Sequence, residues 1–169
     1  MRSQTGRRLV IVYKALGGLL LVISALVCAD HTNKKRALSL ERAEGWTALL
    51  GYVKTQVECF SLPIGEILCR CDKKLLLRCG FTSSEEPPLE LSSFVESCDI
   101  SDSETERLMR ELASEFGRCY REEQVKRCEY YIGMLETRVG SMREQLQVKK
   151  KLTTTLWLTG SLMLVILFL

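Results

Sequence analysis

The sequence contains a single histidine, His31, the side chain that most often carries general acid–base catalysis and metal binding. His31 lies close to three basic residues at positions 34–36, which makes it a poor general base. A phosphate-binding glycine loop and a nucleophile motif are absent as well. These shortages favour a protein that is not an enzyme, with no catalytic residue, no cofactor and no small-molecule substrate.

Alternation of apolar and polar residues with period two is absent over any strand length, and proline occurs only at Pro63, Pro87 and Pro88. Apolar residues instead recur at steps of three and four, which is typical of amphipathic helices. We therefore predict an all-α fold in which the central part of the chain is a helical bundle.

Acidic residues are missing from both ends of the chain, since all 21 lie between residues 30 and 151. Four of the 24 basic residues precede this region and leave 20 within it, so the region is near neutral. The formal net charge of +3 therefore comes from the N-terminal flank. Such a distribution is not the basic footprint of a nucleic-acid-binding protein.

Two stretches have almost no charge and predict membrane helices. Residues 9–29 are apolar apart from Lys14, and residues 152–169 contain no charged residue. About 18 helical residues at about 1.5 Å each reach about 27 Å, close to the thickness of a hydrocarbon core. An alternative for the first stretch is a cleaved signal peptide, because residues 27–29 loosely fit a cleavage site.

The chain is thus predicted to have four parts: a short basic N-terminus (1–8), a transmembrane helix (9–29), a helical domain (30–151) and a C-terminal transmembrane helix (152–169). Basic clusters at residues 34–36 and 149–151 flank the domain at both ends. Because basic flanks favour the cytoplasmic side of a bilayer, we predict a cytoplasmic domain with both termini outside.

The strongest helical pattern is a stripe from Val125 to Leu146 that continues without a break into the last membrane stretch. It predicts one helix over residues 122–169, and shorter stripes predict helices before and after residue 80 that pack on it. The residues predicted to form this core stripe are Trp46, Leu50, Val53, Leu112, Phe116, Val125, Cys128, Ile132, Leu135, Val139, Met142 and Leu146.

Local signals place the helix ends. Pro63 suits the first position of a helix that reaches roughly Cys79, and Gly80 is a C-terminal stop. Residues 82–88 are a loop, and residues 89–97 form a short helix. Asp102 or the serine after it caps the next helix.

Eight cysteines are many for a chain of this length, and most lie within helical patterns. Cys59, Cys69, Cys71 and Cys79 form the one group that resembles a metal site. Their spacing of nine, one and seven intervening residues lacks the short C-x2-4-C pairs of structural zinc sites. We therefore interpret the cysteines as reduced thiols that act as small apolar residues.

Gly133 and Gly140 lie one heptad apart in the longest predicted helix. One interpretation is close contact with a partner helix, including self-association. The other interpretation is that both glycines are simply tolerated on an exposed flank.

Three short motifs occur far apart in the chain. Residues 63–68 read Pro-Ile-Gly-Glu-Ile-Leu, residues 116–117 and 121–124 read Phe-Gly and Arg-Glu-Glu-Gln, and residues 164–169 read Leu-Val-Ile-Leu-Phe-Leu. At these three places the sequence resembles the stage III sporulation protein AB family. The chain departs from the family at Cys119-Tyr120, where the family often has Ser-Asp, and at Cys128, where it often has an aliphatic residue.

The resemblance implies a non-enzymatic component of the channel complex between mother cell and forespore, inserted in the mother-cell-side (outer forespore) membrane. It implies a domain similar to the cytoplasmic domains of secretion-system platform proteins, which docks a secretion-type ATPase and other channel proteins. Arg107, Arg110, Glu111 and Glu115 are the candidate partner surface. The alternative is a membrane-anchored adaptor or a thiol-responsive sensor that uses Cys69 and Cys71.

Overall fold

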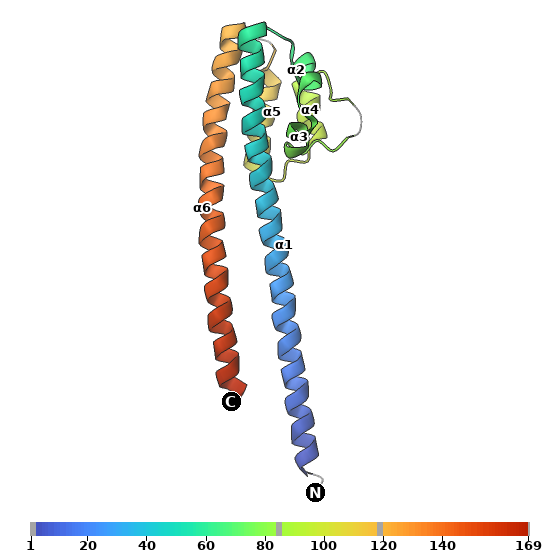
Figure 1. The fold of residues 1–169 in the computed structure, drawn as a ribbon, viewed down its shortest axis with the longest axis vertical. Helices are drawn as coiled ribbons and strands as arrows, with labels where there is room; N and C mark the ends of the chain where they lie inside the picture. The colour runs from blue at the N-terminus through green and yellow to red at the C-terminus, as the bar shows by residue number, and fades with distance from the viewer. Residues whose placement is uncertain (1–2, 84–85, 118–119, 169) are drawn as a thin grey trace. The chain divides into compact units, whose positions relative to one another are not determined.

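The computed structural model describes the backbone of residues 3–83, 86–117 and 120–168, and the side chains of residues 30–31, 33–83, 86–117 and 120–149. Six helices follow one another along the chain (Figure 1): α1 (Ser3–Phe60), α2 (Ile64–Arg70), α3 (Lys73–Arg78), α4 (Leu91–Ser97), α5 (Ser103–Glu115) and α6 (Arg121–Phe168). The described backbone forms no strand, only an isolated antiparallel bridge between Phe81 and Cys98. The predicted all-α class is confirmed for this part of the chain.

Residue contacts divide the chain into two compact units, Met1–Lys35 and Arg36–Leu169. Where side chains are described, the first unit contains an ion pair between Lys34 and Asp30 at 2.7 Å, one helical turn apart. Among the described residues, no helix combines the length and the apolar character needed to cross a bilayer. The predicted membrane helices at 9–29 and 152–169 lie outside the described side chains and stay predictions.

The core of the second unit takes side chains from all six helices. Within this unit α6 runs beside the second half of α1, and α2, α3 and α4 group on the other side of α1 (Figure 1). The fully buried ring of Trp46 packs edge-on against Phe94 of α4, with ring centres 5.6 Å apart. The ring of Phe81 also packs on Phe94, with ring centres 5.3 Å apart. These aromatic contacts fix α4 and the segment after α3 on α1.

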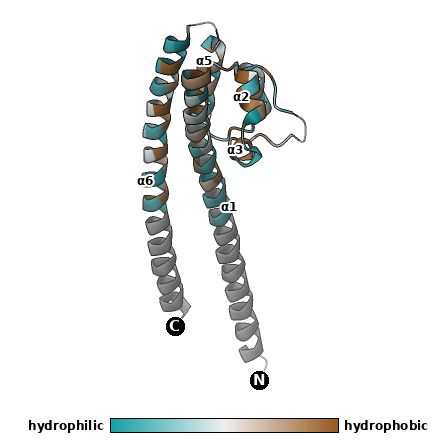
Figure 2. Cartoon of the chain, turned by 45° about the horizontal axis from the view of Figure 1, so that its top comes forward, coloured by the Kyte–Doolittle hydropathy of each residue, from teal (hydrophilic) through white to brown (hydrophobic). Residues whose placement is uncertain are grey.

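Figure 2 shows apolar and polar residues alternating along the described part of α6, as expected of a helix with one buried face. Of the residues in the core stripe, seven are buried, namely Trp46, Leu50, Val53, Leu112, Cys128, Leu135 and Val139. The other five are half-buried, namely Phe116, Val125, Ile132, Met142 and Leu146. The first turn of α5 lies beside Arg138 of α6. Met142 and Leu146 come after Arg138 on α6, so α5 does not cover them.

One predicted helix proves to be two. The sequence predicts a single helix from Pro63 to about Cys79, but Cys71 is extended, with φ −70° and ψ 147°, and separates α2 from α3. Asp72 explains the break, because its carboxylate accepts a hydrogen bond from the Lys74 amide at 2.9 Å and caps α3. An aspartate that bonds the backbone two residues ahead competes with helix continuation. Pro63 is the N-cap residue that precedes α2, whereas the sequence predicts it at the first position of the helix.

The predicted helix stop at Gly80 is confirmed, and the conformation of Gly80 lets a segment distant in sequence approach it closely. Gly80 has φ +97°, and a Cβ there would stand 2.5 Å from the Asp99 carbonyl oxygen. The Asp99 amide in turn donates to the Gly80 carbonyl at 3.0 Å. Glycine is therefore required both for the left-handed turn and for the close approach of the segment that leads into α5.

Candidate docking surface and the contacts that hold it

The four residues predicted as a partner surface are all exposed on α5. Arg107 bonds Glu104 at 2.7 Å and Glu111 at 3.1 Å, and Arg110 bonds Glu106 at 2.8 Å. These pairs are three or four residues apart, the spacing at which helical side chains meet. The polar face of α5 is therefore densely charged, with four glutamates and two arginines in the helix, and both arginines are already paired within it.

Glu115 differs from the other three because it points to α6. Its carboxylate pairs with Arg127, which also binds Glu123 at 2.9 Å. The last turn of α5 is thus tied to the first turns of α6, and Glu115 marks the junction of the two helices.

The first turn of α5 is tied to α6 as well. Arg138 donates two hydrogen bonds to the Asp102 carboxylate, at 2.6 Å and 3.1 Å. The same carboxylate caps α5 by accepting from the Thr105 amide at 3.0 Å and from its hydroxyl at 2.8 Å. The hydrogen bonds from Arg138 hold the pKa of Asp102 below its usual value. One carboxylate therefore both starts α5 and anchors it on α6.

A buried arginine reaches the same loop from α1. Arg42, whose side chain is 10% exposed, pairs with the Asp99 carboxylate at 2.6 Å. It also donates to the Ser101 hydroxyl at 2.8 Å and to the Asp99 carbonyl. A buried charge is tolerated only when it is paired and hydrogen-bonded, and these contacts satisfy that need. The loop before α5 is thus held from α1 and from α6.

Two further ion pairs set α1 against α6. Lys54 binds Glu129 at 2.6 Å, and Arg143 binds Glu44 at 2.6 Å. The hydrogen bond that Lys54 donates to the Glu129 carboxylate raises the pKa of Lys54. The earlier α1 residue, Glu44, pairs with the later α6 residue, Arg143, and the later Lys54 pairs with the earlier Glu129. The two helices therefore run antiparallel in the second unit.

The thiols are mostly part of the packing. Cys71, Cys79 and Cys128 are buried, Cys98 is half-buried, and Cys59 and Cys69 are exposed. Burial raises the pKa of Cys98 to about 12 and that of Cys128 to about 11, so both stay protonated near neutral pH. Burial also raises the pKa of Cys71.

The metal-like cysteine group does not converge. Among the residues whose side chains are described, no cluster of three or more His, Cys, Asp or Glu side chains is arranged to hold a metal ion. The side chain of Cys28 and the whole of Cys119 lie outside the described part of the chain.

Sequence reasoning missed the ties that fix α5. Asp102 is predicted as a cap, but its bond to Arg138 spans 36 residues and has no local signal. Arg42 does carry a signal, because it lies one turn before Trp46 on the buried face of α1. A charged residue in a core stripe indicates a buried ion pair.

Gly133 and Gly140 are exposed on α6, and a Cβ at either position would meet nothing within 4 Å. No described residue of this chain requires glycine there. Both interpretations of these glycines, contact with a partner and simple tolerance, therefore remain predictions.

A search among curated proteins and a search among solved structures found no match. A comparison with protein families did find one, over the part of the chain that contains α4, α5 and α6. The model of the stage III sporulation protein AB family matches residues 90–169, which confirms the resemblance predicted from the sequence over that part of the chain.

Proposed function

We propose that this chain is a membrane-anchored, non-enzymatic assembly component of the sporulation channel between mother cell and forespore. The family match over residues 90–169 carries the proposal, because it implies a role related to sporulation. In this role the chain positions other proteins and transforms no substrate.

The membrane part of the proposal rests on the sequence. The uncharged stretches at residues 9–29 and 152–169 would anchor the chain in the mother-cell-side membrane, with the domain in the cytoplasm. The basic clusters at residues 34–36 and 149–151 support this orientation.

The mechanism would be mechanical. A secretion-type ATPase or another channel protein docks on the exposed face of α5 around Arg107 and Glu111. Asp102 and Glu115 fix the two ends of α5 on α6 through Arg138 and Arg127. Because α6 runs as one helix from Arg121 to Phe168, a displacement of α5 is passed along α6 towards the predicted anchor.

Charge reversal on α5 tests this function. Changing both Arg107 and Arg110 to glutamate removes two ion-pair partners on an exposed face, so the fold should survive. We expect loss of co-purification with the partner ATPase and with other channel proteins, together with a loss of spore formation.

The matched control is Arg70→Glu. Arg70 is an exposed arginine on α2 that pairs with Glu66 one helical turn away, as Arg110 does with Glu106 on α5. It should leave binding and spore formation unchanged. Normal binding and sporulation in the double α5 variant would refute the docking surface.

A further inference from the structure

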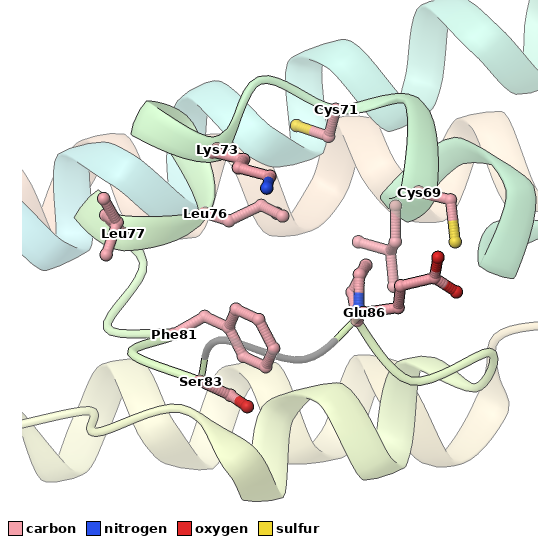
Figure 3. Close-up of a pocket in the computed structure, with 10 residues that line it drawn as sticks. Cys69, Cys71, Lys73, Leu76, Leu77, Phe81, Ser83 and Glu86 are labelled. Atoms are coloured by element: carbon pink, nitrogen blue, oxygen red, sulfur yellow. The ribbon is translucent and has the colours of Figure 1, made fainter.

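A hollow of about 480 Å³ lies between α2, α3 and the segment that follows α3 (Figure 3). Its walls are mainly apolar: Leu68, Leu76 and Phe81 are 0%, 4% and 6% exposed, and they belong to the core of the domain. Leu77, also in the lining, is 58% exposed. The volume falls within the range of about 300–1,000 Å³ that is typical of binding pockets.

Two charged side chains line this hollow without a partner among the described residues. Lys73 at the start of α3 and Glu86 before α4 form no ion pair or hydrogen bond with any residue that the structure describes. In Figure 3 the Lys73 nitrogen lies next to Leu76, and the Glu86 side chain lies apart from it, near Cys69. By contrast, Glu66 and Arg70 on the neighbouring helix neutralise each other.

We propose that this hollow receives an apolar side chain from a segment of a partner protein, flanked by an acidic residue on one side and a basic residue on the other. The apolar walls would stabilise the complex by removing the anchor side chain from water. The acidic flank pairs with Lys73 and the basic flank with Glu86. Complementary charges of this kind select the partner and its register.

The separation of the two charges favours a peptide chain over a small ion as the occupant. A small anion is attracted by Lys73 but repelled by Glu86. A small cation is attracted by Glu86 but repelled by Lys73. A peptide segment can present both charges at once, on either side of its anchor. All the residues that line the hollow precede residue 90 and none belongs to α5, so this proposal does not depend on the proposed function.

Cys69 supplies a built-in reporter, because it is exposed and lines the hollow. Cys59 is exposed but does not line it, so it serves as an internal control. The full-length chain in lipid nanodiscs is alkylated in the presence of synthetic peptides, and the rate at each cysteine is followed by mass spectrometry. The peptides have a central leucine with flanks Glu/Lys, Glu/Glu or Lys/Lys, and a Glu/Lys peptide with central alanine is the blank.

We expect the Glu/Lys peptide to slow alkylation of Cys69 at least fivefold and to leave Cys59 unchanged. Lys73→Glu should shift the preference to the Lys/Lys peptide, and Glu86→Lys should shift it to the Glu/Glu peptide. The matched controls Lys74→Glu and Glu90→Lys change exposed neighbours that do not line the hollow, and they should keep the original preference.

The proposal is overturned if no peptide protects Cys69, or if the preferred flanks do not follow the charges at positions 73 and 86. It is also overturned if an apolar anion such as anilinonaphthalene sulfonate protects Cys69 through Lys73 while no peptide does. Arg107→Glu/Arg110→Glu should not change peptide protection, so failure of this site and failure of the α5 surface can be told apart.

Discussion

Asp102 and Arg138 lie 36 residues apart in sequence, and their side chains share two hydrogen bonds that fix the first turn of α5 on the middle of α6. The Asp102 side chain is 11% exposed, so water cannot easily replace Arg138. Whatever docks on α5 therefore acts on a helix that is firmly attached to α6. The stability of this attachment can be measured directly.

Asp102→Asn should lower the free energy of unfolding by about 2 kcal/mol at pH 7, because the charge-assisted pair with Arg138 is weakened while asparagine can still cap the helix. Urea denaturation of the domain followed by circular dichroism measures the change. Glu104→Gln removes a charge of the same sign two residues away on an exposed side chain and should have a much smaller effect.

The same variant predicts a pH dependence. Arg138 lowers the pKa of Asp102 in the folded protein, so the carboxylate stabilises the fold above its unfolded pKa of about 3.8. This contribution is lost as the pH falls through the folded pKa. The difference in unfolding free energy between the original chain and Asp102→Asn should therefore shrink towards zero as the pH is lowered from 5 to about 2. An unchanged difference over that range would show that Asp102 is not paired in solution.

Leu135→Ala should destabilise the domain by about 2–5 kcal/mol, because Leu135 is fully buried on the core face of α6 and its removal leaves a cavity. Met134→Ala is the matched control, since Met134 is the neighbour of Leu135 and is itself 37% exposed. We expect it to change stability by less than about 1 kcal/mol. Equal midpoints in thermal unfolding would mean that the stripe on α6 does not form a core.

Two glycines of α1 should respond in opposite directions to alanine. A Cβ at Gly45 would stand 2.8 Å from backbone atoms of Arg78, so Gly45→Ala must push α3 away and should cost about 1–3 kcal/mol. A Cβ at Gly51 meets nothing within 4 Å, so Gly51→Ala should gain about 0.5–1 kcal/mol from helix propensity. If both variants lose or both gain stability in denaturant titrations, the close packing of α3 on α1 is refuted.

Thiol reactivity distinguishes the assembly role from a thiol-responsive sensor. Cys59 and Cys69 are exposed and should react rapidly with an alkylating reagent at pH 7.5. Cys98 and Cys128, whose pKa values are raised to about 12 and about 11 by burial, should react only after unfolding. The measurement is alkylation by residue, with and without urea. Fast native labelling of Cys71, followed by a change of shape on oxidation, would instead support the sensor.

Helix positions were accessible from the sequence because their signals are local. The spacing of apolar residues along 125–146 predicts α6, and Asp102 and Gly80 mark a helix start and a helix stop without reference to the rest of the chain. The break at Cys71 was missed, although Asp72 carries a cap signal, because the apolar pattern continues across it. Periodicity reports which residues favour burial but not where the backbone turns.

The sequence by itself determined the all-α class, the near-neutral domain and the stripe that becomes the face of α6 buried in the bundle, since each depends on residues close together in the chain. Only the tertiary structure decided that Arg42 and Arg138 hold the loop before α5, and that Lys73 and Glu86 line one apolar hollow, where neither pairs with a residue that the structure describes. Contacts between distant residues depend on how helices cross, and single-sequence periodicity contains no information about crossing.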